Sequence, residues 1–82
     1  MNEIEQKLYD FILEHFDIDA DDPDFSPEID MFEYGYLDSL GSFEIIEFIE
    51  DTWNVEITQK DLILYPMNSI REIAEVIGKK LS

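Results

Sequence analysis

Apolar residues recur at three- and four-residue steps in three segments of this chain, and this spacing limits the possible folds more than any other feature. Near the N-terminus the series is Ile4, Leu8, Phe11, Ile12 and Phe16. Such spacing gathers apolar side chains on one face of an α-helix. No segment reads convincingly as a strand, so the sequence predicts an all-α protein.

Apolar periodicity predicts the first of two long helices, and cap signals add the bounds of the second. We predict the first over about residues 2–16 and the second over about residues 39–52. Asp38 stands where it can cap the N-terminus of the second helix. Asn54 follows that helix, where a left-handed residue is needed, and asparagine tolerates this conformation.

Two capping boxes predict the rest of the helical structure. Thr58-Gln59-Lys60-Asp61 begins a short helical turn that runs through Leu64 and is stopped by Pro66. Ser69-Ile70-Arg71-Glu72 begins the last helix, whose apolar stripe consists of Ile70, Ile73, Ala74, Ile77 and Leu81.

A long acidic connection separates the first two helices. Asp17 to Pro27 contains five acids and two prolines, which do not continue a helix. Met31 and Phe32 are expected to anchor this connection to the core. We therefore predict a small four-helix bundle, three main helices and one short one, with a long first loop and a single domain over residues 1–82.

The net charge of −16 restricts the possible partners. It argues against nucleic acids and anionic membranes, and favours partners with basic surfaces. The chain has no cysteine, which fits a reducing cytoplasm, and we find neither a signal peptide nor a membrane span. We expect a cytoplasmic monomer.

The second predicted helix has two different faces. Its core stripe is Ile45, Ile46, Ile49 and Trp53. Its opposite face gathers Leu40, Phe43, Glu44, Glu47 and Asp51. Like charges at these spacings cost about 0.2–0.5 kcal/mol per pair, so we interpret the face as a docking surface for a basic partner. The alternative is a solvated face that keeps the protein soluble.

Ser39 begins this helix and is expected to be exposed. Only the latter half of the G-x-S-x-G nucleophile elbow is present, and no sheet is predicted to carry it. The single histidine, His15, falls on an apolar stripe and is interpreted as a packed residue rather than a general base. We therefore predict no catalysis, and a serine that another enzyme modifies. Gly41 indicates either a loose first turn or a close approach to the backbone, the second being slightly favoured.

A calcium-binding loop is a further alternative. Asp17, Asp19, Asp21 and Glu28 fall at four ligand positions of an EF-hand loop. Asp22 occupies the position where that loop requires glycine. We assign no specific metal site, and weak non-selective binding of divalent ions stays open.

Asp38-Ser39-Leu40 at the start of an acidic helix, in a short acidic helical chain, resembles the acyl carrier protein family. Phe32 before the motif and Trp53-Asn54-Val55-Glu56-Ile57 after it extend the resemblance over nearly the whole length. The resemblance implies that a phosphopantetheinyl transferase attaches 4′-phosphopantetheine from coenzyme A to Ser39, assisted by Asp38 through magnesium and phosphate contacts. The thiol of that arm then carries an acyl or aminoacyl group as a thioester.

Gly35-Tyr36-Leu37-Asp38-Ser39-Leu40-Gly41 is similar to D-alanyl and related aminoacyl carriers, whereas fatty-acid carriers usually have Leu-Gly-x before Asp-Ser. Polyketide and nonribosomal peptide pathways stay open. The implied partners are the transferase, a loading ligase and a downstream transferase, all with basic surfaces. An unmodified acidic interaction module is the alternative function.

Overall fold

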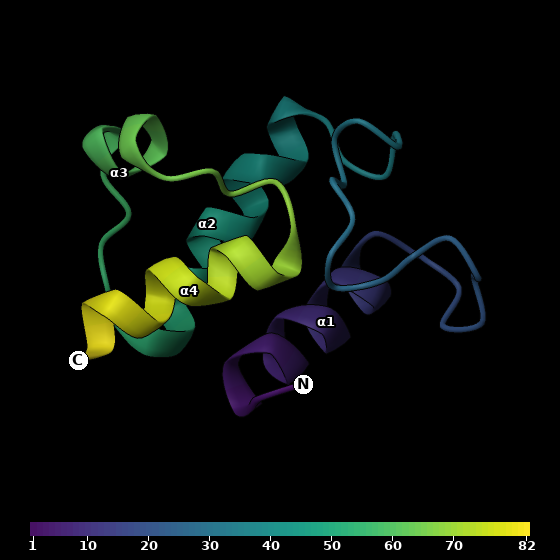
Figure 1. Cartoon of the computed structure of the whole chain (residues 1–82), viewed down its shortest axis with the longest axis horizontal. Helices are drawn as coiled ribbons and strands as arrows, with labels where there is room; N and C mark the ends of the chain where they lie inside the picture. Colours follow the sequence, from purple (N-terminus) through teal and green to yellow (C-terminus); the bar gives the residue numbers. More distant parts are fainter.

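Every helix predicted from the sequence is present in the computed structural model, which describes all residues from 1 to 82. The elements are α1 (Glu3–His15), α2 (Ser39–Trp53), α3 (Gln59–Leu64) and α4 (Ile70–Leu81). Predicted and observed bounds agree within about one residue, and no strand occurs. The prediction of a small all-α bundle with one short helix is confirmed (Figure 1).

The predicted caps are confirmed. Asp38 accepts a hydrogen bond at the start of α2, and Thr58 and Ser69 form complete capping boxes at the starts of α3 and α4. Asn54 ends α2 with φ 55° and ψ 42°, the left-handed conformation expected there. A further capping box, at Asn2, begins α1 and was not predicted.

One apolar core joins the helices. α1 and α4 lie side by side, with α2 next to them (Figure 1). The buried apolar residues are Leu8, Ile12, Phe25, Met31, Leu37, Ile45, Ile49, Ile57, Ile70, Ile73, Ala74, Val76 and Ile77. In the predicted stripe of α2, Ile45 and Ile49 are buried whereas Ile46 and Trp53 are only half-buried. Phe48, which was not assigned to the stripe, stacks on Phe11 of α1 with ring centroids 4.0 Å apart.

The connection between α1 and α2 makes a wide excursion (Figure 1) but is fixed to the core. Met31 is fully buried, and its N–H donates to the carbonyl oxygen of Asn68 (2.8 Å). The carbonyl oxygen of Met31 accepts the N–H groups of Tyr36 (2.9 Å) and Leu37 (3.1 Å). Met31 is therefore the predicted anchor, and it fixes the backbone that leads into α2.

A second anchor in this connection was not predicted. The hydroxyl of Tyr36 donates to Oδ2 of Asp22 (2.9 Å), and its ring packs edge-on against buried Phe25. Partial burial, the hydrogen bond to Asp22 and the charges of Asp22 and Asp24 together raise the pKa of Tyr36 to about 12. The acidic loop is thus held against the segment that precedes Asp38.

None of the four helices combines the length and the apolar composition that crossing a bilayer requires.

Candidate functional site

Ser39 is the first residue of α2, and its side chain is exposed. The helix start is held by Asp38, whose Oδ1 accepts the N–H of Gly41 (2.9 Å) and whose carbonyl oxygen accepts the N–H of Ser42 (3.1 Å). The Ser39 hydroxyl is therefore presented to solvent from a fixed backbone. The first turn of α2 contains no acid after the cap, so the positive end of the helix dipole there is not neutralised from within that turn.

Gly41 is explained by a close approach from within the chain. The residue is buried, and a Cβ placed on it would lie 3.1 Å from Cε1 of Phe16 and 3.3 Å from Cδ2 of Leu37. The favoured interpretation, a close approach to the backbone, is confirmed. Phe16 makes that approach, and the cap geometry shows that the first turn is regular rather than loose.

His15 is placed as a packed residue, but one that also reaches solvent. Its ring stacks on Phe11 and meets Phe16 edge-on. The side chain is 44% exposed, and Nε2 lies 2.5 Å from Oε2 of Glu44. That contact was not predicted. It pairs the one imidazole of the chain with a carboxylate rather than with Ser39.

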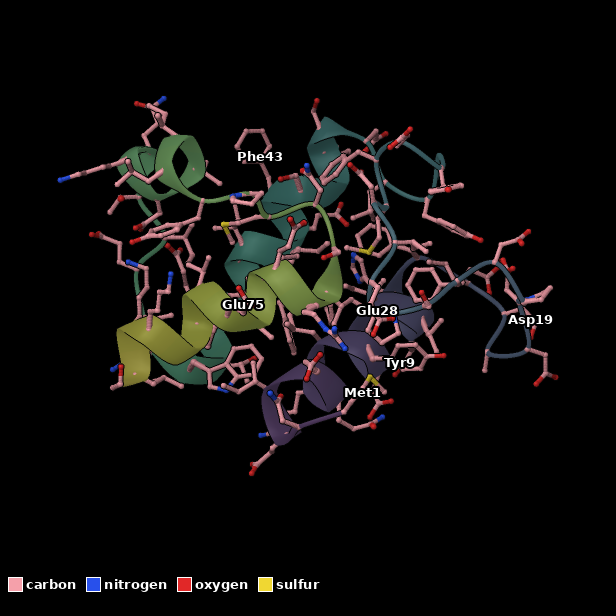
Figure 2. All side chains as sticks on the ribbon, viewed as in Figure 1. Met1, Tyr9, Asp19, Glu28, Phe43 and Glu75 are labelled. Carbon is pink, nitrogen blue, oxygen red and sulfur yellow. The ribbon has the colours of Figure 1, made fainter.

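The predicted docking face is exposed for the most part. Leu40 and Phe43 are 66% and 67% exposed, and Glu47 and Asp51 are exposed as well. Glu44 is half-buried, because it turns toward His15 at the end of α1. Phe43 projects outward from α2 on the side of the molecule where α3 lies (Figure 2).

α3 leaves its apolar side chains largely exposed to solvent, which sequence reasoning missed. Leu62, Ile63 and Leu64 are 43%, 81% and 57% exposed, and no residue of α3 is buried. Instead, Asp61 faces Lys80 of α4, with Oδ2 2.8 Å from Nζ. The signal was available: three consecutive apolar residues cannot share one face of a helix, because successive side chains lie about 100° apart.

The interior beside the site offers no room for a substrate. A cleft between α2, α3 and α4 has a volume of only about 10 Å³, close to the least that holds one water molecule. Its lining residues are Phe32, Ser42, Ile45, Ile46, Leu62, Met67 and Ile73. Any group that reacts with Ser39 must therefore approach from outside.

The acidic loop does not gather its carboxylates as a calcium site requires. Glu28 pairs with Arg71 (2.6 Å), and Oδ1 of Asp19 accepts the N–H of Asp21 (2.9 Å). No three His, Cys, Asp or Glu side chains lie close enough to share a metal ion. The EF-hand spacing in the sequence is not accompanied by EF-hand geometry.

Comparison with protein-family models gives a match over residues 6–77 to the phosphopantetheine attachment site family. The chain belongs to this family. Members are non-catalytic carriers that hold 4′-phosphopantetheine covalently, so the predictions of a carrier, of its prosthetic group and of a protein that is not itself an enzyme are confirmed. Comparisons with curated proteins and with solved structures gave no match.

Proposed function

We propose that Ser39 is the attachment point, and that the whole of residues 1–82 acts as one carrier domain. The observation that carries this proposal is the position of Ser39: exposed, first in a capped helix, and directly after Asp38. The phosphodiester of the arm would lie at the N-terminus of α2, where backbone N–H groups and the helix dipole favour an anion. The arm, once attached, supplies a terminal thiol for a thioester.

Asp38 has a second role in this proposal. Its Oδ1 is used by the cap, whereas Oδ2 makes no hydrogen bond within the chain. We propose that Oδ2 contacts the magnesium ion that accompanies coenzyme A in the transferase. The same carboxylate then fixes the helix start and helps to install the arm.

The partner face is proposed to comprise Leu40, Phe43, Glu44, Glu47 and Asp51. The exposed apolar residues of α3, Ile63 above all, extend it. An apolar patch surrounded by acids suits the transferase and loading enzymes if these present basic surfaces with apolar recesses.

The cargo is proposed to be an aminoacyl group. The support is the run from Gly35 to Gly41, which has the D-alanyl and aminoacyl carrier pattern rather than the fatty-acid carrier pattern. A cytoplasmic location, suggested by the cysteine-free sequence, belongs to the same proposal.

Intact-mass spectrometry tests the attachment site. A phosphopantetheinyl transferase of broad specificity, with coenzyme A and magnesium, should add one phosphopantetheinyl group to the wild-type chain and none to Ser39→Ala. Ser42→Ala is the matched control, since Ser42 lies one turn further along α2 and is half-buried; this variant should be modified normally. A wild-type chain left unmodified, beside a carrier that is modified, would favour the acidic interaction module instead.

A further inference from the structure

The contact between His15 and Glu44 joins the end of α1 to the proposed partner face. Oε2 of Glu44 lies 2.5 Å from Nε2 of His15, and both side chains keep partial access to solvent, 44% for His15 and 38% for Glu44. Because the imidazole is stacked on Phe11, it is held in place beside the carboxylate. Of the acids assigned to that face, Glu44 is the one with an ion-pair partner inside the chain.

The charged groups around His15 are all acidic. Between α1 and α2 lies an open groove of about 370 Å³ whose lining residues are Phe11, His15, Glu44, Glu47, Phe48 and Asp51. Glu14 of α1 and His15 line a second open surface together with Phe11, and Asp17 lies two residues after His15 in the chain. No lysine or arginine lines either surface. A protonated His15 is thus the cation that Glu44 contacts in the free protein.

We propose that His15 is an internal competitor for Glu44, and that it weakens association of a basic partner with α2 when the imidazole is protonated. The inference rests on the proposed function, because the partner is the enzyme that modifies Ser39. A lysine or arginine of that enzyme can still reach Oε1 of Glu44, which makes no hydrogen bond within the chain, but it competes with His15 for the negative charge of the carboxylate. Imidazole changes its charge between about pH 5 and 8, whereas lysine and arginine stay charged over that range. Docking therefore strengthens as pH rises.

The kinetics of Ser39 modification test this competition at pH 6.0 and pH 8.5. The rate of each variant is divided by the wild-type rate at the same pH, so that the transferase's own pH dependence cancels. His15→Gln should raise kcat/KM at pH 6.0 by about two- to fivefold, the range for an exposed ion pair, through a lower KM with unchanged kcat. At pH 8.5 the ratio should be close to one.

Lys7→Gln is the matched control. Lys7 is an exposed cation of α1 that makes no ion pair. Loss of this charge changes the net charge equally at both pH values. The modification rate of Lys7→Gln, divided by that of the wild type, should therefore not depend on pH. Glu44→Gln should lower kcat/KM more at pH 8.5 than at pH 6.0, and His15→Gln should bring no gain when added to it.

The inference would be overturned if Ser39 is modified but the rate ratios of His15→Gln and Glu44→Gln are the same at both pH values. An effect of His15→Gln equal to that of Lys7→Gln would overturn it as well. A wild-type chain that is modified at neither pH would overturn the proposed function, and this inference with it.

Discussion

Two helical glycines have opposite surroundings and therefore different roles. Gly41 in α2 has Phe16 and Leu37 within 3.4 Å of a hypothetical Cβ, whereas Gly78 in α4 has nothing within 4 Å. Glycine in a helix interior costs roughly 0.5–1 kcal/mol relative to alanine. At Gly41 that cost accompanies the close packing of Phe16 against the turn that presents Ser39.

Alanine substitutions separate these two roles. Gly78→Ala should raise the free energy of unfolding by about 0.5–1 kcal/mol, the helix-propensity gain. Gly41→Ala should show no such gain, because overpacking costs about 1–3 kcal/mol and offsets it. Urea denaturation of both variants checks this. Equal stabilisation by the two substitutions would mean that Phe16 yields freely and that Gly41 is not needed for packing.

At the residue scale, the sequence was most informative where the cause is local. The helix-capping residues act on backbone groups within a few positions of the chain, so their roles could be predicted. These residues are Asp38, Thr58, Ser69 and Asn54. The ring that fills the space beside Gly41 belongs to Phe16, 25 residues earlier in the chain. Sequence reasoning could predict a close approach to Gly41 but could not name the neighbour.

At the scale of elements, α3 is held by polar contacts rather than by burial. Its N-terminus is closed by the Thr58 capping box, and Asp61 pairs with Lys80. The hydrogen bonds from Lys80 and from the backbone N–H of Thr58 lower the pKa of Asp61 from 3.8 to about 2. Polar attachment lets Ile63 and Leu64 face outward.

The pairing of Asp61 with Lys80 predicts an acid-dependent loss of stability. Because the folded-state pKa is depressed, the contribution is complete above about pH 4 and is lost as pH falls toward 2. The melting temperature of the wild type should therefore exceed that of Lys80→Met at pH 5, and the difference between the two should close between pH 4 and 2. Lys79→Met is the control, since Nζ of Lys79 lies over the Tyr65 ring instead. A difference in melting temperature that persists unchanged to pH 2 would show that the pairing of Asp61 with Lys80 is not its cause.

The elements were easier to predict than their mutual contacts. Periodicity and caps are read within one segment, and they placed all four helices. The stacking of Phe48 on Phe11 and the pairing of His15 with Glu44 depend on how α1 and α2 pack. Nothing within either helix specifies the other as its partner, so these contacts could not be inferred.

At the scale of the whole molecule, we propose that the net charge of −16 directs association with basic partners. Glu47 and Asp51 are exposed on the face that also presents Leu40 and Phe43. Exposed charges are screened over about 8 Å at physiological ionic strength, so steering by these acids depends on salt.

A salt series tests whether this face docks. Glu47→Gln and Asp51→Asn should slow modification of Ser39, more at low salt than at high salt, and leave the melting temperature equal or slightly higher. Glu75→Gln is the matched control, because Glu75 is an exposed acid of α4, away from the proposed face (Figure 2). Lower melting temperatures with unchanged modification rates would show that the two acids are structural.

Ser39 is proposed to carry an arm that ends in a thiol, and because the chain has no cysteine, that thiol can be counted directly. After treatment with the transferase, coenzyme A and magnesium, the chain is freed of small molecules and its thiols are counted with a thiol-reactive reagent. We predict one thiol per wild-type chain, located on the peptide that contains Ser39, and none in Ser39→Ala. No thiol in the wild type, or a thiol that persists in Ser39→Ala, would show that Ser39 does not carry the arm.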